Sequence, residues 1–212
     1  MTVNPVTNKI YVANNDSANV TVIDGATNTT TTIAAGTQPS DVAVNPVTNK
    51  IYVANSGSNT VTVIDGATNG TTTVNVGASP RAVAVNLVTN QIDVVNLRSQ
   101  TVTVIDGTTN GTTTVNVGAF PSAVAVNPVT NKAYVTNWGS DNVTVIDGAT
   151  NSTATVNVGA LPEAVAVNPV TNQIYVANSG DNSVTVIDGV SLATTTVVVG
   201  TGAWSVAVNP LT

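Results

Sequence analysis

The sequence repeats itself every 41 residues, and this period limits the possible folds more than any other feature. The Asn of a Val-Asn-Pro-Val-Thr-Asn segment, or of a close variant, recurs along the chain at Asn4, Asn45, Asn86, Asn127, Asn168 and Asn209. The Asp of a Val-Ile-Asp-Gly segment recurs at the same interval, at Asp24, Asp65, Asp106, Asp147 and Asp188. Five such repeats occupy nearly all of the 212 residues. The period therefore predicts one domain over residues 1–212 and leaves no room for a second.

Each repeat contains four short β-rich runs, as residues 41–77 illustrate. The runs are Val42 to Asn45, Lys50 to Asn55, Thr60 to Asp65 and Thr71 to Val76, and turn-forming residues separate them. Thr, Val and Ile dominate the runs and favour strands, whereas no helical period is present. Both faces of the runs are apolar or small, so each sheet should be covered on both sides. We therefore predict an all-β, five-bladed β-propeller whose blades are four-stranded antiparallel sheets.

One short motif also carries a family resemblance. Tyr134 to Asn137 reads Tyr-Val-Thr-Asn, and the runs that begin at Tyr11, Tyr52 and Tyr175 read Tyr-Val-Ala-Asn. With the surrounding segments, this pattern resembles the YVTN family of β-propeller repeats over essentially the whole chain. The resemblance implies the propeller fold and a bacterial or archaeal surface or exported protein, without a single assigned activity. Members often carry more blades than five, so the number of repeats departs from the family.

The ends of the chain predict how the ring closes. The segment from Val3 to Thr7 holds only the tail of a first strand, whereas Ser205 to Asn209 supplies a complete one. We expect an innermost strand at about Trp204 to Asn209 to pair with the N-terminal strand at Lys9 to Asn14, which would remove exposed sheet edges. The alternative is that the ring closes only in a longer parent chain or an oligomer. Whether the chain is natural, truncated or engineered stays open.

Composition excludes several kinds of function. The chain has neither Cys nor His, which removes thiol nucleophiles, imidazole bases and Cys/His metal sites. Five basic residues against eleven acidic ones give a net charge of −6, a poor match for nucleic acid or an anionic membrane. No run approaches the ~18 apolar residues of a membrane helix. We predict no enzymatic activity, no cofactor and no metal.

The links between strands fall into two sets, one at each end of the strands. The first set holds the repeated Asn-Pro-Val-Thr-Asn and Asp-Gly turns; we call this end the constant edge. The second set holds the links between repeats and the links between second and third strands, which vary; we call this end the variable edge. Phe120, Trp138 and Trp204 are the only Phe and Trp residues, and all fall at the variable edge. Both arginines, Arg81 and Arg98, fall there too.

These residue types concentrate at binding hot spots, because they supply large contact areas or directional donors. With the nearby acids, they form a predicted ligand-binding set: Phe120, Trp138, Trp204, Arg81, Arg98, Glu163 and Asp141. The structural alternative is that Phe120 and Trp204 plug the mouth of the channel, while Trp138 lies flat on a neighbouring loop.

Turn chemistry explains most other charged positions. Each Val-Ile-Asp-Gly aspartate should cap its own turn, with the following glycine in a left-handed conformation. Acids at the variable edge could offer oxygen ligands to Ca²⁺, but no loop has the required Asp-x-Asp-x-Asp-Gly pattern, so solvated loops are favoured. Asp93 replaces the signature Tyr within a strand. A buried carboxylate is costly unless paired, so we expect Arg98 or Arg81 to compensate it; a site built by the substitution is the minority interpretation.

The sequence thus favours a monomeric binding or scaffold propeller that engages a protein or a carbohydrate through the variable edge. Low charge with abundant Thr and Asn suggests an extracellular or cell-surface location. The alternatives are a structural spacer without a ligand, or a fragment of a larger propeller protein.

Overall fold

The computed structural model describes residues 1–209 and contains twenty β-strands in five sheets. The first sheet comprises β1 (Thr2–Asn4), β2 (Lys9–Asn14), β3 (Asn19–Asp24) and β4 (Thr30–Ala34). The second comprises β5 (Pro39–Asn45), β6 (Lys50–Asn55), β7 (Thr60–Asp65) and β8 (Thr71–Asn75). The third comprises β9 (Pro80–Asn86), β10 (Gln91–Asn96), β11 (Thr101–Asp106) and β12 (Thr112–Asn116). The fourth comprises β13 (Pro121–Asn127), β14 (Lys132–Asn137), β15 (Asn142–Asp147) and β16 (Thr153–Asn157). The fifth comprises β17 (Pro162–Asn168), β18 (Gln173–Asn178), β19 (Ser183–Asp188) and β20 (Thr194–Val198).

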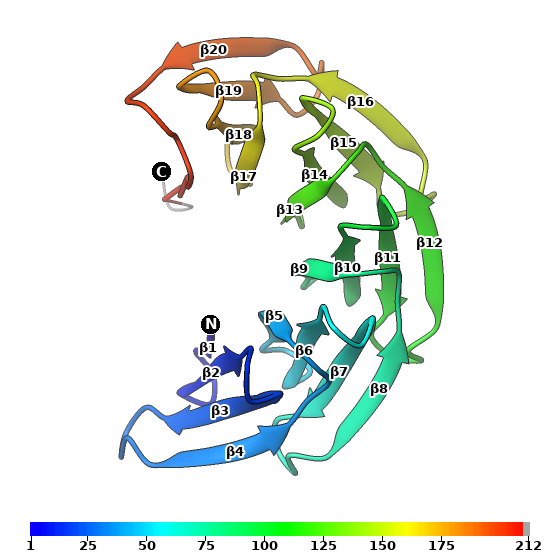
Figure 1. The fold of residues 1–212 in the computed structure, drawn as a ribbon, viewed down its shortest axis with the longest axis vertical. Helices are drawn as coiled ribbons and strands as arrows, with labels where there is room; N and C mark the ends of the chain where they lie inside the picture. The colour runs from blue at the N-terminus through cyan, green and yellow to red at the C-terminus, as the bar shows by residue number, and fades with distance from the viewer. Residues whose placement is uncertain (210–212) are drawn as a thin grey trace. The chain divides into compact units, whose positions relative to one another are not determined.

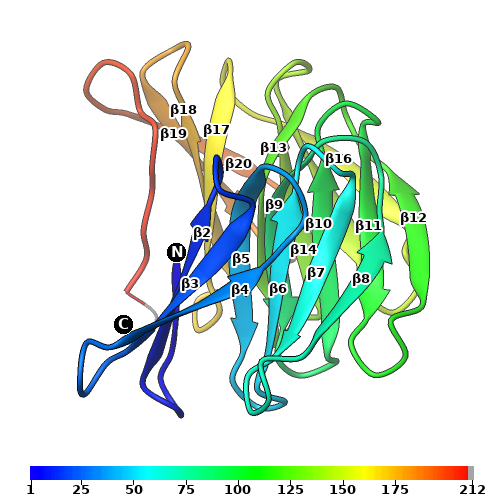
Figure 2. The same cartoon turned by 60° about the horizontal axis from the view of Figure 1, so that its bottom comes forward.

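Every sheet is a four-stranded meander whose neighbours follow chain order, as β5 to β8 show in Figure 1. The ladders are antiparallel; in the second sheet Tyr52 pairs with Ala43 on one side and with Val63 on the other. The predicted blades are therefore confirmed. Figure 2 shows β5 to β8 running between two sets of loops, which correspond to the constant edge and the variable edge.

Contacts divide the chain into two compact units. The first holds residues Met1–Ser99 and Thr103–Thr113, and the second holds Gln100–Val102 and the residues from Thr114 on. The first unit thus contains β1 to β10 and the second contains β13 to β20, while β11 and β12 contribute residues to both. The single domain predicted from the repeats stays a prediction.

Within each unit, apolar sheet faces pack against each other. In the first unit, the face of Tyr52 and Val63 packs on the face of Ile92 and Val94. In the second unit, the face of Tyr134 packs in the same way on Ile174, Val176 and Ile187. Burial falls from the middle strands to the fourth strand, where β8 buries Val74 alone. The β-branched runs therefore form the core because they fill both faces of a pleated sheet.

The first strand of each of the second to fifth sheets carries a β-bulge near its start. In the second sheet, Pro39 pairs with Asn55 and Asp41 with Ala54, so Ser40 is the extra residue. The equivalent extra residues in the next three sheets are Arg81, Ser122 and Glu163. A bulge bends the strand and redirects the extra side chain. The bulge therefore sets the direction in which the side chain of the extra residue points at the variable edge.

The C-terminal segment differs from its prediction. Residues 203–209 carry no strand, although the sequence predicted one at about Trp204 to Asn209. The inner edge of β2 is instead occupied by β1, whose Thr2, Val3 and Asn4 pair with Tyr11, Ile10 and Lys9. A strand forms only where a ladder partner satisfies its backbone groups, and the near half of β2 already has one. Closure of the ring through this segment stays a prediction.

Helices are absent from residues 1–209, so that part of the chain includes none long and apolar enough to cross a membrane.

Candidate ligand-binding edge

The variable edge is built on a backbone frame that repeats from sheet to sheet. In the second to fifth sheets, the residue that follows the second strand donates its N–H to a backbone carbonyl. That carbonyl belongs to the residue just before the first strand of the same sheet. The pairs are Ser56 to Gln38 at 2.9 Å, Leu97 to Ser79 at 3.0 Å, Trp138 to Phe120 at 3.1 Å and Ser179 to Leu161 at 3.0 Å. These bonds hold two loops side by side in each repeat. They also fix which two side chains stand next to each other at the edge.

Buried polar residues anchor this frame from below. In the second unit, the Asn137 Nδ2 donates to Asn142 Oδ1 at 2.8 Å and to Thr144 Oγ1 at 2.9 Å. The Thr144 hydroxyl oxygen in turn accepts from the N–H of Gly118 at 3.3 Å. A Cβ on Gly118 would come within 2.7 Å of the Asn137 amide, so only glycine fits there. The Asn that ends the Tyr-Val-Thr-Asn signature is therefore a structural anchor of the edge.

The frame places variable side chains on left-handed backbone. Gln38, Ser79, Phe120 and Leu161 have φ values of 53°, 57°, 48° and 53°. Gly202 occupies the same position in the last repeat, with φ of 70°. Glycine adopts this conformation without steric cost, whereas a bulky residue adopts it at a cost of order 1 kcal/mol or more. The chain thus keeps large and polar side chains at a position where glycine would be less strained.

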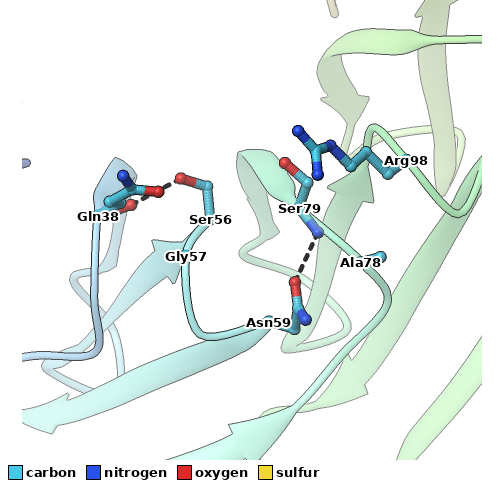
Figure 3. Close-up of a pocket in the computed structure, with 7 residues that line it drawn as sticks. All are labelled: Gln38, Ser56, Gly57, Asn59, Ala78, Ser79 and Arg98. Carbon is cyan, nitrogen blue, oxygen red and sulfur yellow. Dashed lines mark hydrogen bonds between the residues drawn. The ribbon is translucent and has the colours of Figure 1, made fainter.

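In the first unit the edge forms a polar hollow of about 300 Å³, which we call the Arg98 hollow. Its lining comes from four neighbouring loops and consists of Gln38, Ser56, Gly57, Asn59, Ala78, Ser79 and Arg98. In Figure 3 the Arg98 side chain reaches over Ser79, while Gln38 and Ser56 stand on the opposite side. The Ser56 hydroxyl donates to the Gln38 carbonyl at 2.9 Å. Asn59 Oδ1 accepts from the Ser79 N–H at 2.8 Å, which fixes the orientation of that amide.

In the second unit the same frame carries an aromatic pair. Phe120 and Trp138 meet edge to face, with ring centroids 6.3 Å apart and planes at 81°. They are 49% and 39% exposed, so the sequence-based alternative of a buried plug does not describe Phe120. The Phe120 ring lies over Gly139 and fills the space that a Cβ there would need. Beside the pair, Asp141 Oδ1 accepts from the Leu161 N–H at 2.9 Å, as Asn59 does from Ser79.

The structure brings only some of the predicted site residues together. Phe120 and Trp138 form the aromatic pair, and Asp141 lies in the same loop as Trp138. Arg98 lines the hollow in the first unit. Arg81 and Glu163 are bulge residues in separate units. Trp204 follows Gly202 outside any strand and is 67% exposed, so it is not a core plug either.

Sequence reasoning missed the small and amide residues of the hollow, namely Gln38, Ser56, Asn59 and Ser79. A signal for them exists in the repeat. A large residue at the left-handed position faces a glycine in the next loop, as Phe120 faces Gly139 and Leu161 faces Gly180. In the third repeat the sizes are exchanged, because Ser79 and Arg98 occupy these two positions. This exchange marks a place where the edge differs in shape and charge.

At the constant edge the aspartates act in turns, as predicted. Asp65 Oδ1 accepts from the N–H groups of Ala67 and Thr68 at 2.9 Å each, and these bonds hold the pKa of its carboxyl below the ordinary value. The role predicted for the following glycines is wrong, because Asn69 rather than Gly66 has a positive φ. Gly66 is needed for a close approach instead: a Cβ there would lie 2.8 Å from the Asn49 carbonyl oxygen.

Asp93 replaces the signature Tyr in a central strand. It lies on β10 opposite Ala84 and is 6% exposed. Burial raises the pKa of Asp93 to about 7, and neither arginine contributes to the shift. The predicted compensation of Asp93 by Arg81 or Arg98 is therefore wrong: burial alone determines its protonation. Asp41 is also partly buried, and burial raises its pKa although the N–H groups of Val83 and Val42 donate to its carboxylate.

Nothing in residues 1–209 gathers three or more acidic side chains into a group that could hold a metal ion. The hollow and the aromatic pair present aromatic, amide, hydroxyl and guanidinium groups, with the Asp141 carboxylate beside the pair. Such groups recognise ligands by stacking and hydrogen bonding.

Comparison with known proteins supports the fold. Residues 37–64 match the NHL repeat, well under half of the chain. Hydrazine synthase from Kuenenia stuttgartiensis superposes with a TM-score of 0.77 at 20% identity, over 92% of this chain and 63% of that one. Dihydro-heme d1 dehydrogenase NirN, in complex with DHE, gives 0.76 at 15% identity, over 92% of this chain and 44% of that one. A functionally unknown protein from Desulfotomaculum acetoxidans DSM 771 gives 0.77 at 14% identity, over 92% and 67%.

The chain thus spans less than two thirds of the first two of these structures. Among curated proteins no sequence match is found. At such low identity the likeness is one of fold alone. The protein is an all-β repeat protein of the β-propeller class, with five four-stranded antiparallel sheets.

Proposed function

We propose that this protein is a non-catalytic binding module that engages a protein or a carbohydrate through its variable edge. The exposed Phe120 and Trp138 pair is the observation that carries the proposal. Two large rings at a solvent-facing loop offer apolar contact area, and exposed apolar patches of this kind mark interaction sites.

Backbone strain supports the same proposal. Phe120 holds φ of 48°, where a bulky side chain is rare, although Gly202 fills the equivalent position elsewhere in the chain. Residues kept in such conformations cluster at ligand sites, where surrounding structure enforces them. Here the enforcing contacts are the Trp138 N–H, which donates to the Phe120 carbonyl, and the Gly139 N–H, which donates to the Ala119 carbonyl. The frame thus presents the Phe120 ring in one orientation.

A binding role fits the chemistry of the chain better than catalysis. The sequence offers no Cys or His as nucleophile or base. Two of the similar structures carry enzyme names, but fold similarity at 15 to 20% identity transfers no active-site residues. The proposal includes a monomer at the surface of a prokaryotic cell or exported from it, without nucleic-acid or membrane partners. The competing proposal is a structural spacer without a ligand, for which the polar repeats suffice.

A glycan array and a panel of purified cell-surface proteins distinguish these possibilities. A carbohydrate-binding propeller should show a defined sugar preference, because ring stacking and directed hydrogen bonds select one stereochemistry. A protein-docking propeller should bind a protein and no glycan. A spacer should bind neither.

The double variant Phe120→Ser with Trp138→Ser is the matched test of the site. Serine already occupies the equivalent positions in other repeats, at Ser79, Ser56 and Ser179, so the frame should accept both changes. We expect binding to fall at least tenfold, in keeping with the loss of aromatic hot spots. Val190→Ala is the control, because it trims an exposed apolar side chain at the constant edge of the same unit, where Ala149 occupies the equivalent position. Equal loss in the control, or none in the double variant, would contradict the proposal.

A further inference from the structure

The Arg98 hollow differs from the aromatic pair in both charge and chemistry. Its lining includes one cation, Arg98, and no carboxylate, in a chain whose net charge is −6. The remaining polar groups are the amides of Gln38 and Asn59 and the hydroxyls of Ser56 and Ser79. The hollow therefore combines a single positive charge with several neutral donors and acceptors.

The repeat shows that the arginine is a local substitution. The equivalents of Arg98 are Asp16, Gly57, Gly139 and Gly180, and those of Ser79 include Phe120 and Leu161. A small residue at position 79 leaves room for the long side chain at position 98, which Figure 3 shows reaching across Ser79. In the fourth and fifth sheets an arginine there would clash, because Phe120 and Leu161 already cover Gly139 and Gly180. The small side chain of Ser79 thus leaves room for the Arg98 guanidinium.

Neighbouring hydrogen bonds orient the lining. Asn59 Oδ1 is engaged by the Ser79 N–H, which directs the Asn59 Nδ2 donors away from that bond. The Ser56 Oγ donates to the Gln38 carbonyl, so its oxygen can still accept a hydrogen bond. A guanidinium pairs best with a planar carboxylate, through two parallel N–H···O bonds. Amides and hydroxyls in turn match the hydroxyls of a polyol.

We propose that the Arg98 hollow binds one hydroxylated carboxylate of monosaccharide size, with the chemistry of a sugar acid. Arg98 binds the carboxylate, and Gln38, Asn59 and the two serines bind ring hydroxyls. This site goes beyond the function proposed for Phe120 and Trp138 and does not depend on it, since the two lie in different units. A volume of about 300 Å³ is at the small end of ligand pockets and suits one ring.

Other anions fit the lining less well. A phosphate group carries more charge than one guanidinium neutralises, and phosphate sites usually add backbone N–H groups or a second cation. The lining has no aromatic ring on which a nucleotide base could stack. A neutral sugar would leave the guanidinium without an ionic partner. The carboxylate with hydroxyls is the class that uses every group present.

The test is a titration of the ¹⁵N-labelled protein with sodium D-glucuronate, followed by ¹H–¹⁵N chemical shifts. We expect saturable shifts at residues 56–59, 78–79 and 98, and at least tenfold weaker apparent affinity for D-glucose, which lacks the carboxylate. The variant Arg98→Gly should fold normally, because glycine is the residue of three other repeats at this position. We expect it to bind glucuronate about tenfold or more weakly, the loss expected for a carboxylate that no longer pairs with a guanidinium.

Lys50→Gln is the matched control. It removes one positive charge from the same unit at the constant edge, and Gln91 and Gln173 occupy the equivalent position. Its affinity for glucuronate should stay within about twofold of the wild type, because screened charges act weakly at a distance. Three results would overturn the proposal: no shifts in the hollow, equal weakening by Lys50→Gln, or binding of acetate or inorganic phosphate as tight as that of glucuronate.

Discussion

The Arg98 hollow and the aromatic pair use one backbone frame for opposite purposes. Ser56 and Gln38 in the first unit are joined by the same N–H to carbonyl bond as Trp138 and Phe120 in the second. In the hollow the side chains at these positions are polar and leave space, whereas in the pair two rings fill it. Repeated residues therefore determine the backbone frame, and a few variable positions determine which ligand chemistry the frame can bind.

A substitution of a repeat residue inside a sheet should change the free energy of unfolding more than one at the variable edge. Asp93 has the largest expected effect. Since its pKa is raised to about 7 from 3.8, the folded protein keeps this proton between about pH 4 and pH 7 while the unfolded chain releases it. The free energy of unfolding should therefore fall as pH rises through this window and level off above it. The contribution is on the order of 4 kcal/mol.

Asp93→Asn should flatten this part of the profile, and Asp93→Tyr, which restores the repeat residue, should stabilise the protein most above pH 7. Urea unfolding between pH 4 and pH 8 measures both effects. Asp65→Asn is the control, because Asp65 lies exposed in a turn and its lowered pKa acts only below about pH 4. A profile of Asp93→Asn parallel to that of the wild type would show that Asp93 does not retain a proton on folding.

The frame itself should break when its anchor is removed. Asn137→Ala deletes the bonds to Asn142 and Thr144 at a fully buried position, and we expect a loss of about 2 kcal/mol in the free energy of unfolding. The aromatic pair should lose its fixed geometry as well, visible as a weaker near-ultraviolet circular dichroism signal. Asn157→Ala, at an exposed site on β16, is the control. A loss confined to the control would place the anchor elsewhere.

Exchanging side chains between the two regions tests whether the two positions depend on each other. Gly139→Arg should destabilise the protein by about 1–2 kcal/mol, because the new Cβ would overlap the Phe120 ring. Adding Phe120→Ser reproduces the Ser79 and Arg98 combination and should recover most of that loss. A double-mutant cycle by thermal unfolding measures this coupling. Simple additivity of the two changes would mean that the positions are independent and the size exchange is coincidental.

The smallest effect on stability is expected at Trp204. The side chain is 67% exposed outside any strand, so Trp204→Ser should change the free energy of unfolding by less than about 0.5 kcal/mol. Denaturant unfolding under the conditions used for the other variants provides the value. A loss above about 1 kcal/mol would show that this residue is part of the packed structure in solution, as closure of the ring through Trp204 to Asn209 predicts.

The sequence predicted the sheets well because the repeat carries two kinds of information. Alternation and β-branched residues defined strands such as Lys50–Asn55, and the turn residues placed their ends. Asp65 and its equivalents were assigned to turns for the right reason, since a carboxylate and two nearby N–H groups suffice for that geometry. Such features depend on neighbours along the chain.

The site was predicted only in outline. Chemical type identified Phe120, Trp138 and Arg98, but the hollow also needs the small residues Gly57 and Ser79, which carry no functional signal alone. The bulges that separate Arg81 and Glu163 from the other residues are backbone events, which side-chain patterns do not reveal. The charge state of Asp93 depends on burial between packed strands. These features depend on residues that are distant in the sequence.

The most direct test is to map where a bound partner contacts the protein. The ¹H–¹⁵N chemical shifts of the wild-type protein would be recorded with and without the uncharged glycan or the protein that scores highest in the binding screens. We predict that the perturbed amides gather in the variable-edge loops of the second unit, around residues 118–120 and 138–141. Perturbation centred on the constant-edge turns, such as Ala67 and Thr68, would contradict it.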